Sequence, residues 1–246
     1  MNKNLFLPIL SLLLLFQVIA IVLLRRSDLT FPRYLSIIYS YLSLAILIMV
    51  FFFVLWDKFS IVFSSTQTLV IFILSLLSLL GMFVMYHDRP ILTHLLWVFF
   101  IWSVAVMMYP MIKNTHSSIL VRTLIMVVGL LILLSVIALW NSSYSFLRWE
   151  SGLFLALLIL IIVQLLDLLF SSGMTPLRLK IYSGIGCIIF IGYMLYDTQL
   201  LKIKYESCKT LASSSDFSKC INYPVSSLGI FLDAVNLFSS LVNLQN

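Results

Sequence analysis

Eight long apolar stretches limit the fold of this chain more than any other feature of its sequence. They cover roughly residues 4–24, 34–56, 67–86, 92–112, 118–140, 149–171, 179–201 and 224–244. A helix of about 20 residues crosses a hydrocarbon core of about 30 Å, and inside that core every backbone polar group has to be bonded within the chain. The pattern therefore predicts an all-α membrane protein without strands.

The composition agrees with a chain that lies almost entirely in lipid. Of the 246 residues, 62% are hydrophobic and 10% are charged, whereas a soluble domain carries about 25% charged residues. A soluble catalytic or ligand-binding domain is excluded, so any function lies inside the bundle or along its rim. We predict a multi-pass protein of an endomembrane (ER or Golgi) or plasma membrane if the chain is eukaryotic or viral, and of the inner membrane if it is bacterial.

The formal net charge of +6 does not indicate a nucleic-acid partner, because Lys and Arg are spread singly along the loops. Counted by alternate loops, nine of them lie on the side of Arg25 and six on the other, which favours a cytosolic Arg25 and an external C-terminus. Cys208 and Cys220 then face a reducing compartment, and the sequon at Asn141 faces away from the glycosylation machinery. We expect all three to be unmodified.

The first apolar stretch lies within residues 1–30 and resembles both a signal peptide and an anchor. Arg25 and Arg26 follow its leucine-rich core at once, and no small-residue cleavage site of the A-x-A type is present. We therefore expect an uncleaved N-terminal anchor, followed by a region of seven spans over residues 31–246.

Three acids within or beside the apolar runs carry most of the functional information: Asp167, Asp197 and Asp233. A charge at the middle of a membrane costs at least about 2.5 to 3.5 kcal/mol on insertion scales, so an acid in such a place is a candidate functional group. Asp167 lies near the end of its stretch, one turn from Gln164. Solvation at the interface explains its position simply, and a place on a secondary ion pathway is the alternative.

Asp197 and Asp233 belong to consecutive, antiparallel stretches, so both acids fall in the same half of the membrane. Two carboxylates in a poorly solvated place cannot both ionise cheaply, and such a pair shares one proton and titrates as a unit. The pair is therefore a candidate proton switch. The alternative is that each acid merely bonds the backbone or a neighbouring amide such as Asn236.

The segments that contain these acids resemble a known family. Residues 196–199 (YDTQ) and 228–238 (LGIFLDAVNLF) are similar to the C-terminal signature of the Bax inhibitor 1 family, also called the transmembrane Bax inhibitor motif or lifeguard family. Residues 31–44 (FPRYLSIIYSYLSL) resemble the start of its first helix, 86–90 (YHDRP) the basic turn after its second, and 152–156 (GLFLA) its fifth helix. The resemblance covers roughly residues 30–246.

The resemblance implies a seven-helix bundle, here with one extra N-terminal helix, and a pH-sensitive calcium leak that modulates calcium stores and cell death. Asp197 and Asp233 match the paired aspartates that hold the closed state in related proteins. Arg89 falls where a family arginine pairs with that dyad. Calcium would be a permeant ion that the two aspartates bind transiently, and no cofactor is expected.

The third family helix usually carries an acid near its start, but residues 95–109 contain none. This absence favours a second hypothesis, a non-conducting adaptor that binds host or partner membrane proteins in the bilayer to regulate apoptosis or trafficking. The compact length also suits virus-encoded members of the family.

Nothing in the sequence predicts an enzyme. His87, His94 and His116 lie near loop borders, and neither a G-x-S-x-G nor an H-E-x-x-H motif is present. Gly184 and Gly186 lack the third glycine and the preceding strand of a dinucleotide site. We interpret them as notches for close helix packing.

Overall fold

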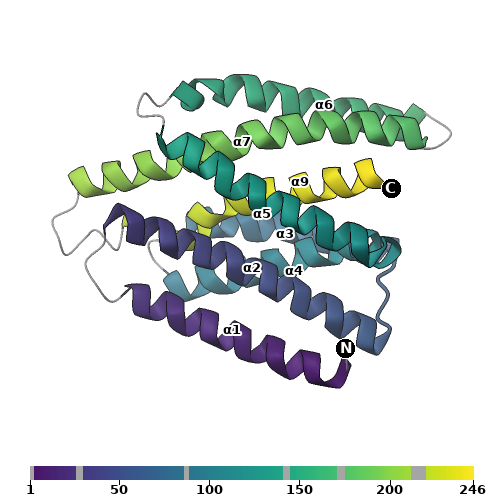
Figure 1. The fold of residues 1–246 in the computed structure, drawn as a ribbon, viewed down its shortest axis with the longest axis horizontal. Helices are drawn as coiled ribbons and strands as arrows, with labels where there is room; N and C mark the ends of the chain where they lie inside the picture. Colours follow the sequence, from purple (N-terminus) through teal and green to yellow (C-terminus); the bar gives the residue numbers. More distant parts are fainter. Residues whose placement is uncertain (1–2, 26–29, 86–88, 141–144, 171–174, 212–219) are drawn as a thin grey trace. The chain divides into compact units, whose positions relative to one another are not determined.

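The computed structural model describes residues 3–25, 30–85, 89–140, 145–170, 175–211 and 220–246. Eight helices in this part of the chain are long and apolar enough to cross a membrane, and no strand occurs among these residues. The prediction of an all-α, multi-pass membrane protein is confirmed (Figure 1). The elements are α1 (Lys3–Arg25), α2 (Phe31–Phe59), α3 (Ser65–Val84), α4 (Pro90–Asn114), α5 (Ser117–Trp140), the 3₁₀ helix η1 (Ser145–Trp149), α6 (Glu150–Phe170), α7 (Pro176–Leu211) and α9 (Tyr223–Gln245).

The helices begin and end where local chemistry dictates. Proline lies at the first or second position of α2, α4, α7 and α9, where its missing N–H costs no helical hydrogen bond. A capping box opens α3: the Ser64 side chain accepts from the N–H of Gln67, and the Gln67 side chain accepts from the N–H of Ser64. α2 ends at Ser60, whose left-handed backbone (φ 52°) turns the chain out of the helix.

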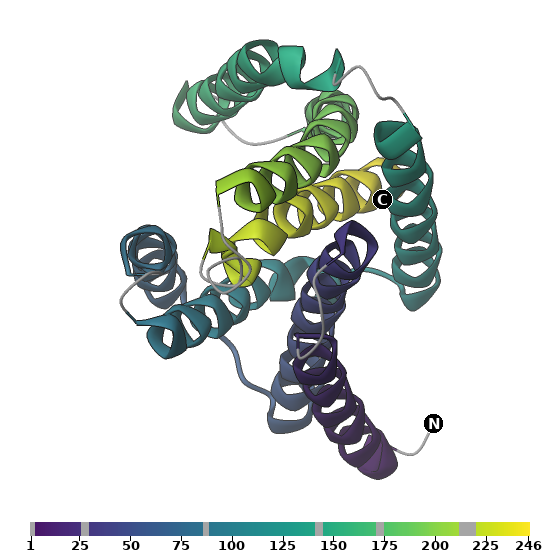
Figure 2. The ribbon, with the colours of Figure 1, turned by 90° about the vertical axis from the view of Figure 1, so that its left-hand side faces the viewer.

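The chain divides into two compact units. The first comprises residues 1–113 and 207–228, and the second comprises residues 114–206 and 229–246. In the first unit α1 runs alongside α2, as Figures 1 and 2 both show, and Gln17 donates a hydrogen bond to the carbonyl of Ser40 across the pair. The extra N-terminal helix is thus packed against its neighbour. Cleavage before residue 31 stays untested, as does the predicted division at that residue.

The second unit consists of α5, η1, α6 and most of α7 and α9. Its core packs apolar side chains of α5, α7 and α9, with Met194 and Leu237 fully buried. α6 differs, because only 6% of its apolar span is buried, against 28% of α5. A helix with so much exposed apolar surface is suited to contact lipid.

The apolar stretch predicted to end at residue 201 is part of a longer helix, because α7 continues to Leu211. Hydropathy falls after Leu201, but the apolar residues Leu201, Tyr205 and Cys208 recur at helical spacing and all are buried. This amphipathic period maintains the helix where a continuous apolar run no longer exists.

The expectation that Cys208 and Cys220 are unmodified is also wrong, because they form a disulfide. The continued α7 puts Cys208 one turn before the helix end, and the chain returns so that the two Cα atoms lie 5.8 Å apart, within bonding range. Disulfides persist in oxidising compartments. The bond therefore conflicts with the weak charge count that placed these cysteines in the cytosol. The sequon at 141–143 lies outside the described residues.

Candidate functional site

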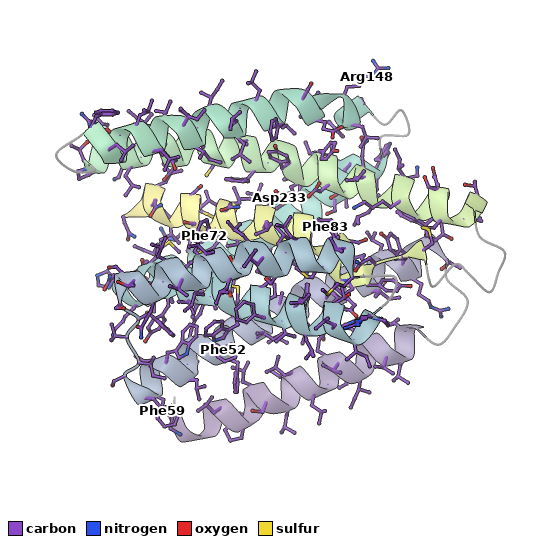
Figure 3. All side chains as sticks on the ribbon, turned by 180° about the vertical axis from the view of Figure 1, so that it is seen from behind. Phe52, Phe59, Phe72, Phe83, Arg148 and Asp233 are labelled. Atoms are coloured by element: carbon purple, nitrogen blue, oxygen red, sulfur yellow. A yellow bond between two sulfur atoms is a disulfide. The ribbon has the colours of Figure 1, made fainter. Side chains whose placement is uncertain are left out.

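Asp197 of α7 and Asp233 of α9 face each other across two consecutive helices. Their carboxyl groups are hydrogen-bonded to one another. Asp233 is only 5% exposed, and Figure 3 labels it part-way along α9. Asp197 is half-buried. Its carboxyl group is hydrogen-bonded to that of Asp233.

A hydrogen bond between the two carboxyl groups of Asp197 and Asp233 requires a proton. An ionised carboxylate has only acceptors, so one acid has to carry a hydrogen in order to donate. The second carboxyl oxygen of Asp233, Oδ2, has no hydrogen-bond partner within the described structure. The geometry therefore fits a pair that holds one proton.

Gly229 lets Asp197 approach the backbone of α9. A Cβ placed at Gly229 would overlap Oδ2 of Asp197 and would lie 2.8 Å from its Cγ. Gly229 precedes Asp233 by one turn, so the same face of α9 provides both the notch and the second acid. Any larger side chain at this position would displace the Asp197 carboxyl group.

A second glycine contact holds the same two helices together further along. A Cβ at Gly186 of α7 would lie 3.0 Å from the hydroxyl of Ser240 on α9. From one contact to the other the residue number changes by eleven on both helices, in opposite directions. Eleven residues are about three turns, so both contacts lie on one face of each helix.

The prediction of packing notches at Gly184 and Gly186 is half correct. Gly186 is a notch, but a Cβ at Gly184 meets no atom within 4 Å. Gly192 is a further notch, since a Cβ there would lie 2.6 Å from Leu153 of α6, whereas a Cβ at Gly152 meets no atom within 4 Å. Leu153, beside Gly152, makes the close contact in its place.

Charged and titratable groups around the pair come from α6 and α7. Lys204, two turns beyond Asp197 on the same helix, acts electrostatically on the Asp197 carboxylate. Tyr193 is within electrostatic range of both aspartates. Glu150, at the start of α6, is hydrogen-bonded to Tyr196. Lys204 can therefore offset part of the negative charge that loss of the shared proton would create.

Gln199 anchors α7 two residues beyond Asp197, and the sequence analysis missed this role. Its amide nitrogen donates to the carbonyl of Ala138 over 3.1 Å, and its amide oxygen accepts from the N–H of Phe146 over 3.0 Å. The side chain is 1% exposed. A buried glutamine inside an apolar run was the available signal, since such an amide has to find partners.

The two other predicted site residues are Asp167 and Arg89. Asp167 forms an ion pair with Arg178, with Oδ1 and Nη1 2.7 Å apart, which joins the end of α6 to the start of α7. Arg178 precedes Asp197 by 19 residues, which is about 28 Å of helix. Arg89 is exposed at the start of α4 and belongs to the first unit. Its pairing with the dyad stays a prediction, as does a pathway role for Asp167.

A resident metal site would need more ligands than this pair supplies. Among the described residues, no group of three or more His, Cys, Asp or Glu side chains is placed to hold a metal ion. Calcium takes six to eight oxygen ligands. Two aspartates could bind it only together with backbone carbonyls and water.

Comparison with known proteins identifies the family. A family model described as "Inhibitor of apoptosis-promoting Bax1" matches residues 31–246. The chain belongs to this Bax inhibitor family. The match includes both aspartates and begins where α2 begins, after the extra N-terminal helix.

Curated relatives of this Bax inhibitor family member come from a plant and a bacterium. It is 24% identical to a BI1-like protein of Arabidopsis thaliana over 65% of the chain and 57% of that relative. It is 32% identical to Protein LIFEGUARD 1 of the same plant over 50% of the chain and 46% of the relative. An uncharacterized Campylobacter jejuni protein is 32% identical over 45% and 40%. The chain thus spans less than two thirds of these relatives, and they do not support a viral origin.

Proposed function

We propose that this member of the Bax inhibitor family is a pH-sensitive cation leak, permeable to calcium, whose gate is the Asp197–Asp233 pair. The observation that supports the proposal is the hydrogen bond between the two carboxyl groups, which joins α7 to α9 inside the apolar part of the bundle. Because the family description names inhibition of an apoptosis-promoting protein, control of cell death through calcium stores is the proposed physiological role.

The shared proton keeps the gate closed in this proposal. While it is present, the two acids attract each other and hold α7 against the Gly229 notch of α9. When it leaves, two carboxylates stand side by side, and two like charges about 4 Å apart repel by about 4 kcal/mol at an effective dielectric constant of 20. Lys204 offsets only part of this repulsion. The helices then separate and the negative charge attracts a divalent cation.

The sign of the pH dependence follows from this order of events. Acidification supplies the proton and lowers efflux, and alkalinisation removes it and raises efflux. An asparagine at position 197 donates its amide N–H to Asp233 at every pH, so the contact needs no shared proton. It also carries no charge that could repel Asp233 when Asp233 ionises. Asp197→Asn is therefore expected to give low efflux at every pH.

Calcium-loaded liposomes that contain the purified full chain provide the test. Efflux is measured over a series of acidic to alkaline pH values for the wild type, Asp197→Asn and Asp233→Asn. Asp167→Asn is the matched control, because it also removes a carboxylate from the second unit but leaves the pair intact. If Asp197→Asn keeps the pH dependence of the wild type, the proposed gate is wrong.

A non-conducting adaptor is the second candidate. The observation that favours it is the absence of any acid in α4, a helix of which half the span is buried and which the family resemblance expected to carry one. Such a protein would bind other membrane proteins in the bilayer. Zero calcium efflux from liposomes that contain folded protein, together with crosslinking to specific membrane partners in cells, would select this function over the leak.

A further inference from the structure

Beyond the aspartate pair, α9 carries a polar stripe that the proposed gate does not use. Asn236, Ser240 and Asn243 follow Asp233 at intervals of three, four and three residues, so all four lie on one face of the helix. Amides and hydroxyls are costly in a lipid core unless a polar partner or water satisfies them. Their surroundings therefore decide whether they serve packing or hydration.

These side chains line a cavity of about 390 Å³ within the second unit. The wall also contains Gln164 of α6 and Ser183 of α7, among apolar side chains of the same two helices. A volume of this size holds on the order of ten water molecules. Small polar residues often serve only to bring helices together, but here Asn236 and Asn243 border open space.

The position of the cavity follows from the two glycine contacts. With Gly186 against Ser240 and Asp197 against Gly229, the antiparallel register brings Asn243 level with Ser183 and Asn236 level with Phe190. The lining begins at Leu179, one turn inside the start of α7, and at Asn243, close to the end of α9. It stops at Asn236, which is three residues or about 4.5 Å of helix from Asp233.

We propose that this cavity is an aqueous vestibule that admits hydrated cations from the C-terminal end of α9 to within one turn of the aspartate pair. Amide and hydroxyl oxygens there replace water around a passing cation without fixing it, because the lining side chains are neutral. Only the role of the vestibule in cation passage rests on the proposed function. Its existence can be tested on a protein that conducts nothing.

Accessibility of single cysteines to a charged, membrane-impermeant thiol reagent tests the vestibule in the full chain. The background is Cys187→Ala, which removes the one free cysteine of the described structure. Asn243→Cys, Ser240→Cys and Asn236→Cys are then labelled in intact membranes, and each variant is first checked for a monodisperse gel-filtration peak. We expect labelling of all three, fastest at position 243 and slowest at 236, from the side that also labels the exposed Asn246→Cys.

Two matched controls at similar depth define the alternatives. Ile188→Cys replaces a residue of α7 that is 74% exposed, and Leu237→Cys replaces a fully buried core residue. Charged reagents partition poorly into lipid and core, so the three vestibule positions should react at least about tenfold faster than both controls. Reaction of Asn236→Cys as slow as that of Leu237→Cys, or reaction only with a lipid-soluble maleimide, would overturn the vestibule.

The efflux assay separates failure of this inference from failure of the proposed function. Rapid labelling in a protein without calcium efflux would retain the vestibule and refute the leak. Slow labelling in a protein with pH-gated efflux would refute the vestibule alone. If both hold, modification of Ser240→Cys should lower efflux severalfold, and modification of Asn246→Cys should leave it unchanged.

Discussion

Replacement of Gly229 by alanine tests whether the aspartate pair depends on the notch in α9. The added Cβ would overlap Oδ2 of Asp197 and lie 2.8 Å from Cγ and 3.4 Å from Oδ1. Ordinary contacts need about 3.5 to 4.0 Å, so the carboxyl group has to retreat by roughly 1 Å. Hydrogen bonds between oxygens span about 2.5 to 3.0 Å, so a shift of this size breaks the bond to Asp233.

The expected cost of Gly229→Ala follows from that broken bond. Loss of a partner for a buried acid destabilises by about 1 to 3 kcal/mol. Alanine regains about 1 kcal/mol through its higher helix propensity, so we expect a net loss of up to about 2 kcal/mol and a weaker pH dependence of efflux. Gly184→Ala is the matched control, since its Cβ meets no atom within 4 Å and should leave stability unchanged or raise it.

A double-mutant cycle decides whether the clash with Asp197 is the cause. In an Asp197→Ala background the carboxyl group is gone, so adding Gly229→Ala should cost nothing further and should gain the helix propensity. Thermal unfolding in detergent gives the four stabilities, and the coupling should be about 1 to 3 kcal/mol, as for residues in contact. Additive effects of the two substitutions would refute the proposed contact.

Three further predictions concern the supports of the site. Gln199→Leu removes two hydrogen bonds and leaves buried backbone groups unpaired, so unfolding in detergent should show a loss of about 1 to 3 kcal/mol. Arg178→Gln breaks a half-exposed ion pair with Asp167 and should cost less than about 1 kcal/mol, with the loss shrinking in high salt. Without reducing agent, Cys208 and Cys220 should resist alkylation, and reduction should make both reactive; equal alkylation in both conditions would exclude the disulfide.

The sequence predicted the fold well because lipid imposes a simple rule. Continuous apolar runs have to form helices, and all eight stretches do so. The errors occur where the rule stops applying. After Leu201 the residues are polar enough for water, and only the buried positions Tyr205 and Cys208 reveal that α7 continues. A continuous-run criterion cannot detect an amphipathic helix, whereas a period of 3.6 residues can.

Only those features of the candidate site that follow from charge and helix order could be predicted from the sequence. An acid in each of two consecutive spans has few partners except the other acid, so the pairing of Asp197 with Asp233 could be predicted. The partners of Gln199 could not, because its hydrogen bonds reach residues 53 and 61 positions away along the chain. Gly229 stood in the recognised motif, but its role appears only once Asp197 lies against it.

The register of α7 against α9 explains how a short motif can bring two acids together. One contact between glycine and a side chain would hold two helices at a point and leave them free to slide or rotate. Two contacts, three turns apart and each with the glycine on a different helix, fix both the level and the facing sides. Asp233 then lies on the face already aligned with Asp197. The same alignment extends the polar face of α9 from the pair to Asn243, so the register that fixes the acids also places the wall of the cavity beside them.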